Sequence, residues 1–326
     1  MAKQKTVVDR KHSIIVVTPV FEDTEASSRL FQEIAREFGH TAYIVAVDDG
    51  SVKQPVQIAS IAKAGLDGTV VRLRRNVGHQ RAIAIGLGHV SEWIQPHQRV
   101  VVMDSDGEDL PSSIPILLKQ LEDPQNDVVV ASRKSRVETL RFKAFYILYK
   151  WLFSTMTGRS VSFGNFMAMK AHAATRLVAM QELSIHLAAA VLVSKLRTAL
   201  YPLDRGARYA GRSKMNFVGL VLHGFKGLMV FAEDVLVRVG IFSAVVALAT
   251  IVGSAAAVVL KLIGFSTPGW FSIALGTLVL IFLQTGALAL MTLMLTGVVR
   301  GGTVMTQVAY HHFIDEIIET RGRTSA

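Results

Sequence analysis

Four carboxylates crowd into six residues immediately after an apolar run. Asp104, Asp106, Glu108 and Asp109 follow the segment RVVVM and come shortly before Pro111. Carboxylates this close repel one another unless a cation is bound, and Mg²⁺ and Mn²⁺ prefer oxygen ligands in company with substrate phosphates. We therefore predict a site for Mg²⁺ or Mn²⁺ at this turn. The alternative is a solvated acidic turn that precedes the next helix.

A second charged segment is basic. It runs from Leu203 to Lys214 and also contains Arg205, Arg208 and Arg212. Bound anions stabilise crowded positive charges; Arg holds phosphate oxygens in a bidentate fork, and Lys acts as a mobile point charge. We predict that Arg208 and Lys214 bind phosphates. The alternative is that these side chains pair with surface carboxylates or with lipid headgroups.

The elements that must position these residues show in the hydrophobic pattern. Strands are expected at 13–21, 42–47, 69–73, 99–103 and 127–131, and helices at 24–38, 56–64, 80–93 and 112–122. Strands that alternate with helices form a parallel sheet, in which ligands bind beyond the carboxyl ends of the strands. The turns at Asp48 and Asp104 follow two such strands, so we expect both to face one cleft. The region lacks the glycine-rich phosphate loop and the three-glycine dinucleotide fingerprint, which favours a metal-assisted nucleotide site.

Two long segments without charge follow this region, at 240–260 and 270–299. About 20 helical residues cross a hydrocarbon core of about 30 Å, so each is long enough to span a membrane. The alternative is a pair of core helices in a large soluble fold. The flanks of the pair are basic, at Lys226, Arg238, Arg300, Arg321 and Arg323, whereas the connecting loop offers only Lys261. The positive-inside rule then predicts a multi-pass protein of the cytoplasmic (inner) membrane, with its large N-terminal domain and both termini cytoplasmic.

The composition narrows the functional classes further. The chain has no cysteine, which excludes disulfides and thiolate metal sites. The polar N-terminal segment MAKQKTVVDRKHS lacks the apolar core of a signal peptide, so export of the large domain is not expected. The net charge of +10 suits anionic lipid and phosphate as well as nucleic acid. Because no nucleic-acid-binding motif is present, we expect no nucleic-acid partner.

Taken together, these motifs resemble a known enzyme family. The segments VTPVFED (17–23), VDDGS (47–51), NVGHQRAIAIG (76–86) and MDSDGEDLP (103–111) match, in order and spacing, the family 2 glycosyltransferases with the GT-A fold. The segment RYAGRSK (208–214) resembles the Arg-x-x-Gly-x-Ser-Lys element of the polyprenyl-phosphate branch, to which dolichyl-phosphate mannose synthases and bacterial undecaprenyl-phosphate sugar transferases belong. The resemblance implies an α/β fold: a Rossmann-like GT-A domain with a mostly parallel sheet, followed by a two-helix transmembrane hairpin.

The same resemblance implies a reaction and its site residues. A sugar would move from a UDP- or GDP-linked donor to undecaprenyl or dolichyl phosphate, by metal-dependent displacement with inversion. Asp106 would be the principal metal ligand, and Ser213 would help to place the acceptor phosphate. The implied residues are Pro19, Glu22, Asp48, Asp49, Asp104 and Arg133 for the nucleotide-sugar; Asp104, Asp106 and Glu108 for the metal; and Asp106, Arg208, Ser213 and Lys214 for catalysis. Glu108 stands where many relatives have Gln, and Ser162 where many have Asp.

No general base is expected. A lipid monophosphate is already mostly anionic near pH 7, because its second pKa is about 6. It therefore needs positioning and not deprotonation. On this ground His79, His186 and His223 are interpreted as packing or surface residues.

The expected domain boundaries follow from these assignments. Residues 1–215 form the cytoplasmic GT-A domain, 216–238 an interfacial helix, 239–300 the two membrane helices and 301–326 a cytoplasmic tail. Two amphipathic helices are expected outside these spans, at 141–156, in the headgroup layer or in a core, and at 304–318 in the tail. Two other functions stay open, namely a glycosyltransferase of this fold acting on a different lipid or polymer, and a non-catalytic nucleotide-binding membrane scaffold. The sequence leaves a homo-oligomer open.

Overall fold

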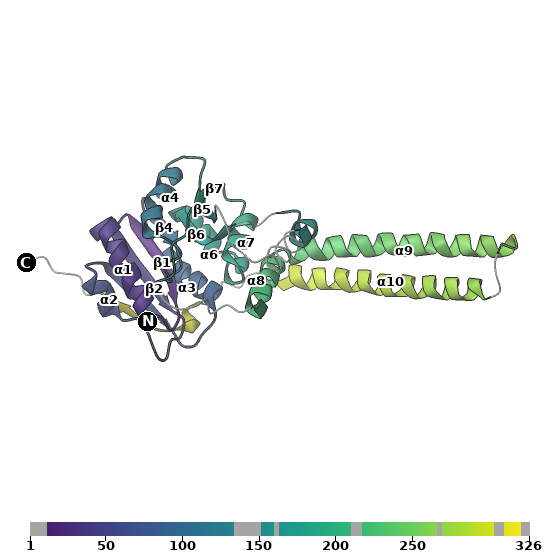
Figure 1. The fold of residues 1–326 in the computed structure, drawn as a ribbon, viewed down its shortest axis with the longest axis horizontal. Coiled ribbons are helices and arrows are strands. Elements are labelled where there is room, and N and C mark those ends of the chain that lie inside the picture. The colour runs from purple at the N-terminus through teal and green to yellow at the C-terminus, as the bar shows by residue number, and fades with distance from the viewer. Residues whose placement is uncertain are drawn as a thin grey trace, which may run out of the picture. The chain divides into compact units, whose positions relative to one another are not determined.

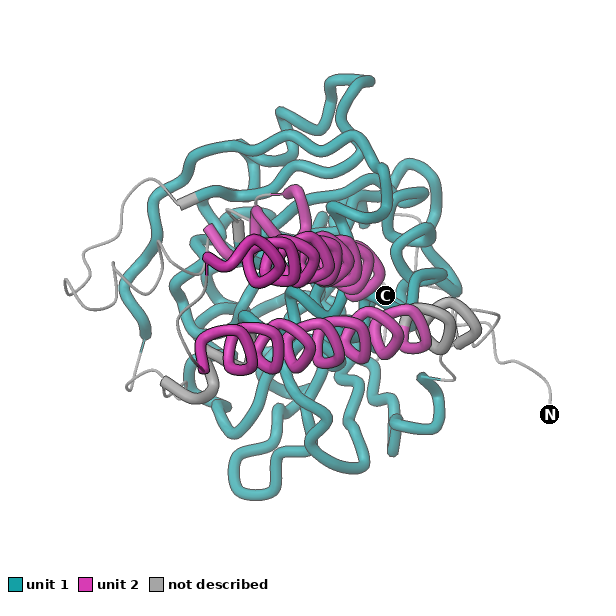
Figure 2. The backbone as a smooth tube through the Cα atoms, turned by 90° about the vertical axis from the view of Figure 1, so that its right-hand side faces the viewer, with its two compact units in different colours: residues 1–142, 161–230, 307–326 teal, residues 143–160, 231–306 magenta. Residues whose placement is uncertain are grey.

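The structure, a computed structural model, describes residues 12–133, 151–159, 163–209, 217–265, 269–302 and 310–320. The chain divides into two compact units, coloured separately in Figure 2. Unit 1 comprises residues 1–142, 161–230 and 307–326, and unit 2 comprises residues 143–160 and 231–306. The C-terminal residues therefore belong to the same unit as the N-terminal ones.

The described part of unit 1 contains an eight-stranded sheet in the order β7-β5-β6-β4-β1-β2-β3-β8. The strands are β1 Ile14–Val20, β2 Ala42–Asp48, β3 Asp67–Leu73, β4 Arg99–Val102, β5 Val128–Arg133, β6 Phe163–Lys170, β7 Thr198–Leu203 and β8 Ile314–Glu319. The pairs β1–β2, β1–β4, β2–β3 and β5–β7 are parallel. The pairs β4–β6, β5–β6 and β3–β8 are antiparallel.

Helices cover both faces of this sheet (Figure 1). They are α1 Thr24–Phe38, α2 Ile58–Lys63, α3 His79–Ser91, α4 Ile114–Leu121, α6 Ala171–Val178 and α7 Leu187–Val193. Unit 1 also contains α8 Phe217–Val230 and short 3₁₀ turns at Gly39–Thr41, Pro111–Ser113, Gln181–Ser184 and Tyr310–Phe313. Along β1, Ile15 and Val17 pack with the α3, α6 and α7 side, and Ile14 and Val16 with the α1 and α4 side. Burial on both faces explains why the predicted strands are apolar throughout.

The predicted elements of residues 13–131 are present, with small shifts at their ends, and the sheet is mixed and mostly parallel, as the resemblance implies. Strand β6 lies between β4 and β5 and runs antiparallel to both. The expectation of a helix in the C-terminal tail is wrong for its described part: Ile314–Glu319 forms strand β8, which pairs with β3. Isoleucines at 314, 317 and 318 suit a strand, and the otherwise open edge of β3 supplies the hydrogen-bonding partners.

Unit 2 contains two long helices, α9 Ala232–Leu262 and α10 Trp270–Gly302, which pack along each other (Figure 1). Both are long and apolar enough to cross a membrane. Helix α9 starts before the predicted residue 240 and includes Glu233, Asp234 and Arg238. Its buried residues Ser243, Thr250 and Ala257 recur every seven positions, so small side chains line the contact with α10, as is common between membrane helices. Of the amphipathic helix predicted at 141–156, residues 151–156 are helical and the rest lies outside the described residues.

Candidate active site

Two adjacent aspartates at the carboxyl end of β2 hold the loops around the predicted nucleotide pocket. Both are buried. Asp48 accepts hydrogen bonds from the backbone N–H groups of Ser51 and Val56, each at 2.9 Å. Asp49 accepts from Val77 N at 2.7 Å and Gly78 N at 3.0 Å. Burial raises the pKa of Asp49, against the opposing effect of these two N–H donors.

Glu22 follows β1 and binds backbone groups of the loop that follows β2. Its carboxylate accepts from three successive N–H groups, Val52 at 2.7 Å, Lys53 at 3.0 and 3.1 Å, and Gln54 at 2.7 Å. These donors, led by Val52, lower the pKa of Glu22. The residue has a φ of 48°, a left-handed conformation that is uncommon for a side chain of this size. Glu22 therefore shapes the loop, and any role in nucleoside binding would act through it.

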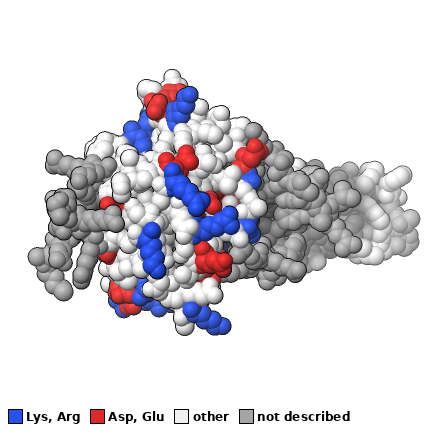
Figure 3. Space-filling view, turned by 60° about the vertical axis from the view of Figure 1, so that its left-hand side comes forward, with Lys and Arg blue, Asp and Glu red and all other residues white. Residues whose placement is uncertain are grey.

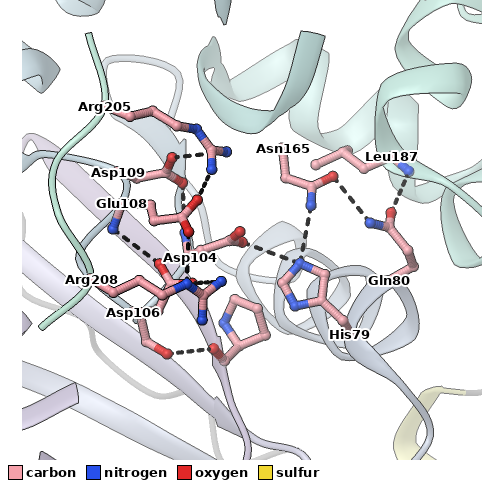
Figure 4. Close-up of polar contacts among 12 residues, drawn as sticks. His79, Gln80, Asp104, Asp106, Glu108, Asp109, Asn165, Leu187, Arg205 and Arg208 are labelled. Carbon is pink, nitrogen blue, oxygen red and sulfur yellow. Dashed lines mark hydrogen bonds and ion pairs between the residues drawn. The ribbon is translucent and has the colours of Figure 1, made fainter. Parts of the chain in front are cut away.

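The acidic turn, residues 104–109, follows β4. It contacts the arginines of the segment Leu203–Tyr209, here called the basic segment (Figure 4). Arg208 Nη2 lies 2.7 Å from Asp106 Oδ2, and Arg208 Nε lies 2.7 Å from Glu108 Oε1. Arg205 Nη1 pairs with Glu108 Oε2, and Arg205 Nη2 lies 3.8 Å from Asp109 Oδ1. Arg208 was predicted to bind phosphates; the structure places it on carboxylates of the predicted metal site.

Backbone contacts bring the basic segment close to the acidic turn. Gly206 N donates to Glu108 O and Tyr209 N donates to Asp106 O, both at 2.9 Å. Gly107 has a φ of 88°, and a Cβ there would lie 2.7 Å from the Tyr209 ring. A Cβ on Gly206 would lie 2.4 Å from Gly107 O. The approach thus requires glycine at both positions.

His79, interpreted from the sequence as a packing or surface residue, lies beside the acidic turn. It is the first residue of α3, and its Nε2 is 3.2 Å from Asp104 Oδ1 and 3.0 Å from Asn165 Nδ2. Asn165 Oδ1 accepts from Gln80 Nε2 at 3.1 Å, and Gln80 Oε1 accepts from Leu187 N at 2.7 Å (Figure 4). Burial acts to lower the pKa of His79, but Asp104 and, more weakly, Asp49 and Asp106 raise it overall. The sequence signal that could have placed His79 in the site was its position at the start of α3, because α3 starts at the carboxyl edge of the sheet.

The other two histidines differ from His79. His186 is buried, and its Nδ1 accepts from Ala189 N at 3.3 Å at the start of α7, a structural contact. The side chain of His223 lies outside the part that the structure describes.

The charges at the acidic turn fit one divalent cation. Asp106, Glu108 and Asp109 pair with Arg205 and Arg208, and Asp104 faces His79, so the four carboxylates and two arginines leave two formal negative charges when His79 is neutral. Burial, and then the charge of Asp104, raises the pKa of Asp106 although Arg208 opposes this. Among the described residues, no three His, Cys, Asp or Glu side chains are grouped so that they could hold a metal ion. Asp104 and Asp106 stay the predicted ligands of such an ion, and Glu108 would first have to release both arginines.

The remaining predicted residues are less fully placed. Pro19 is buried in β1, and its carbonyl accepts from Ser105 Oγ at 3.2 Å, which ties β1 to the acidic turn. Arg133 ends β5 opposite Leu203, the first residue of the basic segment. Ser213 and Lys214 lie outside the described residues. The roles inferred for these residues stay predictions.

On the face shown in Figure 3, basic and acidic side chains of unit 1 are interleaved.

Residues 15–183, from the start of β1 to the segment before α7, match the sequence family described as glycosyl transferase family 2. The chain belongs to this family. Its unit 1 is accordingly a GT-A-like glycosyltransferase domain with a mixed, mostly parallel sheet, followed along the chain by two long apolar helices. The match covers the loops of Glu22, Asp48 and Asp49 and the acidic turn, but ends before the basic segment.

Individual relatives are distant. Dodecaprenyl-phosphate galacturonate synthase of Rhizobium johnstonii is 26% identical over 149 residues, 44% of this chain and 42% of the relative. Undecaprenyl-phosphate 4-deoxy-4-formamido-L-arabinose transferase of Shewanella sediminis is 25% identical over 215 residues, 64% of this chain and 63% of the relative. The chain thus spans less than two thirds of either relative. Among solved structures, glucosyl-3-phosphoglycerate synthase of Mycobacterium tuberculosis with Mn²⁺ and UDP has a TM-score of 0.47 at 16% identity, covering 70% of this chain and 80% of that one.

Proposed function

We propose that this chain transfers a sugar from a nucleotide-sugar to a polyprenyl phosphate at a membrane surface. The observation that carries the proposal is the acidic turn of this family 2 domain. Two arginines balance half of the negative charge of its four carboxylates. The relatives' names add the acceptor class, since both act on polyprenyl phosphates. The two apolar helices add a means of reaching such a lipid.

The reaction breaks the bond between the anomeric carbon and the donor's phosphate oxygen, and forms one from that carbon to a lipid phosphate oxygen. The electron pair of the broken bond leaves with the nucleoside diphosphate, and no proton moves. Asp104 and Asp106 would hold Mg²⁺ or Mn²⁺, and that ion would supply positive charge for the diphosphate. Arg208 adds fixed positive charge where negative charge develops, and Arg205 balances Glu108. Direct displacement of this kind inverts the anomeric configuration.

The position of β8 supports a hairpin topology. Residues before α9 and after α10 both belong to unit 1, because β8 pairs with β3 in its sheet. If both helices cross the membrane, the start of α9 and the end of α10 must lie on the same side of it. The turn between the two helices then lies on the opposite side. The basic flanks then favour a cytoplasmic catalytic unit. We infer a protein of the cytoplasmic membrane with its glycosyltransferase unit and both termini inside.

Membranes containing the full chain can test the function with radiolabelled UDP- and GDP-sugars, offered with undecaprenyl or dolichyl phosphate. The expected result is a lipid-extractable labelled product that requires Mn²⁺ or Mg²⁺ and one acceptor lipid. Asp106→Asn is the matched negative control. Binding of UDP or GDP with Mn²⁺, but no labelled lipid with any donor, would contradict the proposal and favour the scaffold function.

A further inference from the structure

Tyr209, the last described residue of the basic segment, connects the acidic turn to helix α1. Its hydroxyl donates to Glu33 Oε2 at 2.5 Å, and the Arg29 guanidinium lies 4.4 Å from its ring centre. Arg29 Nε in turn lies 3.2 Å from Glu33 Oε1. The backbone N–H of Tyr209 binds Asp106 O, and its ring covers Gly107. One side chain thus joins two elements that are separated by 176 residues in the chain.

The surroundings show why such a connection is needed. The side chains of Arg205, Arg208 and Glu108 are 29%, 31% and 26% exposed, so solvent screens their ion pairs. Partly exposed pairs of this kind define a position weakly. Helix α1, in contrast, is fixed in the core, where Leu30, Phe31 and Ile34 are completely buried. A contact with α1 therefore gives the basic segment a rigid reference.

We propose that Tyr209 and Glu33 are positioning residues for sugar transfer, because their contact, here called the latch, holds the neighbouring Arg208 at the acidic turn. The inference rests on the proposed function, and it adds two residues that act through Arg208. Asp106 forms an ion pair with Arg208 in this structure and would bind a cation during the reaction. If a cation were bound by that carboxylate, the latch would keep Arg208 close enough to meet the diphosphate. Without the latch, the segment has to be ordered again in each turnover, which slows the chemical step.

The first arm of the test measures the latch without any substrate. Hydrogen exchange on the full chain in detergent reports the Gly206 and Tyr209 amides, which bind Glu108 O and Asp106 O. Tyr209→Phe removes the hydroxyl and keeps the ring over Gly107, whereas Glu33→Gln keeps the shape of the side chain and removes the charge that the Tyr209 hydroxyl and Arg29 contact. Each is expected to speed exchange at these amides about tenfold, equivalent to about 1.4 kcal/mol. If the two residues act as one latch, the double variant exchanges no faster than Tyr209→Phe alone.

The second arm measures catalysis. Both variants are expected to lower kcat about tenfold while KM for the nucleotide-sugar stays within about twofold, as for a contact that matters in the transition state. Tyr201→Phe is the matched control, because Tyr201 is a half-buried tyrosine on β7 with no hydrogen bond to the acidic turn among the described residues. It should leave both exchange and kcat unchanged.

The outcomes separate this inference from the proposed function. A wild-type chain that makes no lipid-linked sugar refutes the function, yet the exchange arm still decides whether the latch exists. Unchanged exchange in both variants overturns the latch even if the wild type is active. Faster exchange with a normal kcat overturns the positioning role. A loss of melting temperature in both variants that matches the loss of activity also overturns it, since the contact would then serve only the fold.

Discussion

Replacing Arg208 with Gln should tighten metal binding while it slows sugar transfer. Arg208 Nη2 lies 2.7 Å from Asp106 Oδ2, so Arg208 competes with a cation for this oxygen. Because a metal–oxygen bond is about 2.1 Å, a cation on Asp106 would lie within about 5 Å of the guanidinium nitrogen. Loss of the positive charge removes that repulsion, and loss of the fork removes a phosphate contact. The two effects have opposite signs, which a general disruption of the site would not produce.

The magnitude follows from Coulomb's law. A divalent ion and a unit charge about 5 Å apart repel by about 1.7 kcal/mol in water, the appropriate limit for a side chain near solvent. Salt at about 0.1 M reduces this to about 1 kcal/mol. Mn²⁺ should therefore bind Arg208→Gln about fivefold more tightly than wild type. Transfer should fall by about 10²–10³, the usual loss for a charged hydrogen bond made in the transition state.

The affinity for Mn²⁺ is measured by titrating the full chain in detergent and monitoring the free ion by electron paramagnetic resonance. The rate of transfer is measured as labelled lipid product. Arg99→Gln is the matched control, since it removes the same charge from the opposite end of β4. Weaker Mn²⁺ binding in Arg208→Gln, or an affinity equal to that of the control, would refute the competition between Arg208 and the cation.

Three further predictions concern the metal, the fold and the membrane. Asp106→Asn should abolish transfer, and EDTA should reproduce the loss in wild type, with recovery on added Mn²⁺ or Mg²⁺ in wild type only; an active mutant in chelator would rule out the site. Asp127 is buried and accepts hydrogen bonds from Arg197, and these lower the pKa of Asp127. Asp127→Asn should therefore lower the free energy of unfolding by about 1.5–3 kcal/mol at neutral pH, measured by chemical unfolding. This stabilisation is complete above the unfolded pKa of about 4 and is lost as pH falls below it, so the mutant and wild-type stabilities should converge in acid. A reporter fused at residue 265 should lie outside the cytoplasm and reporters at both termini inside; a cytoplasmic signal at 265 would exclude the hairpin.

The hydrophobic pattern of the sequence was sufficient to predict the first strands and helices. Both faces of β1 and β2 are buried, so β-branched runs mark them without ambiguity. Helix α1 shows an apolar stripe at Leu30, Phe31 and Ile34, and the structure reproduces its predicted bounds. The acidic turn was found because its carboxylates are adjacent in sequence and follow a strand.

What the pattern missed depends on contacts between distant residues. Strand β8 has exposed residues at 315–317 and pairs with β3 across more than 240 residues, so the isoleucines of the tail allow a helix as easily as a strand. His79 reaches Asp104 only because α3 starts at the carboxyl edge of the sheet. Tyr209 reaches Glu33 only after the basic segment has crossed the acidic turn. No local rule relates such pairs, because tertiary packing decides them.

Glu108 shows how a departure from the family pattern is compensated nearby. Glu108 stands where many relatives have Gln, and the resemblance implies that Glu108 is a metal ligand. In the structure its two oxygens bind Arg205 and Arg208. With Gln at 108, three carboxylates would face the same two guanidinium groups and leave one negative charge. With Glu, two remain, which equals the charge of one divalent cation, and Arg205 and Arg208 keep the added carboxylate paired within the basic segment.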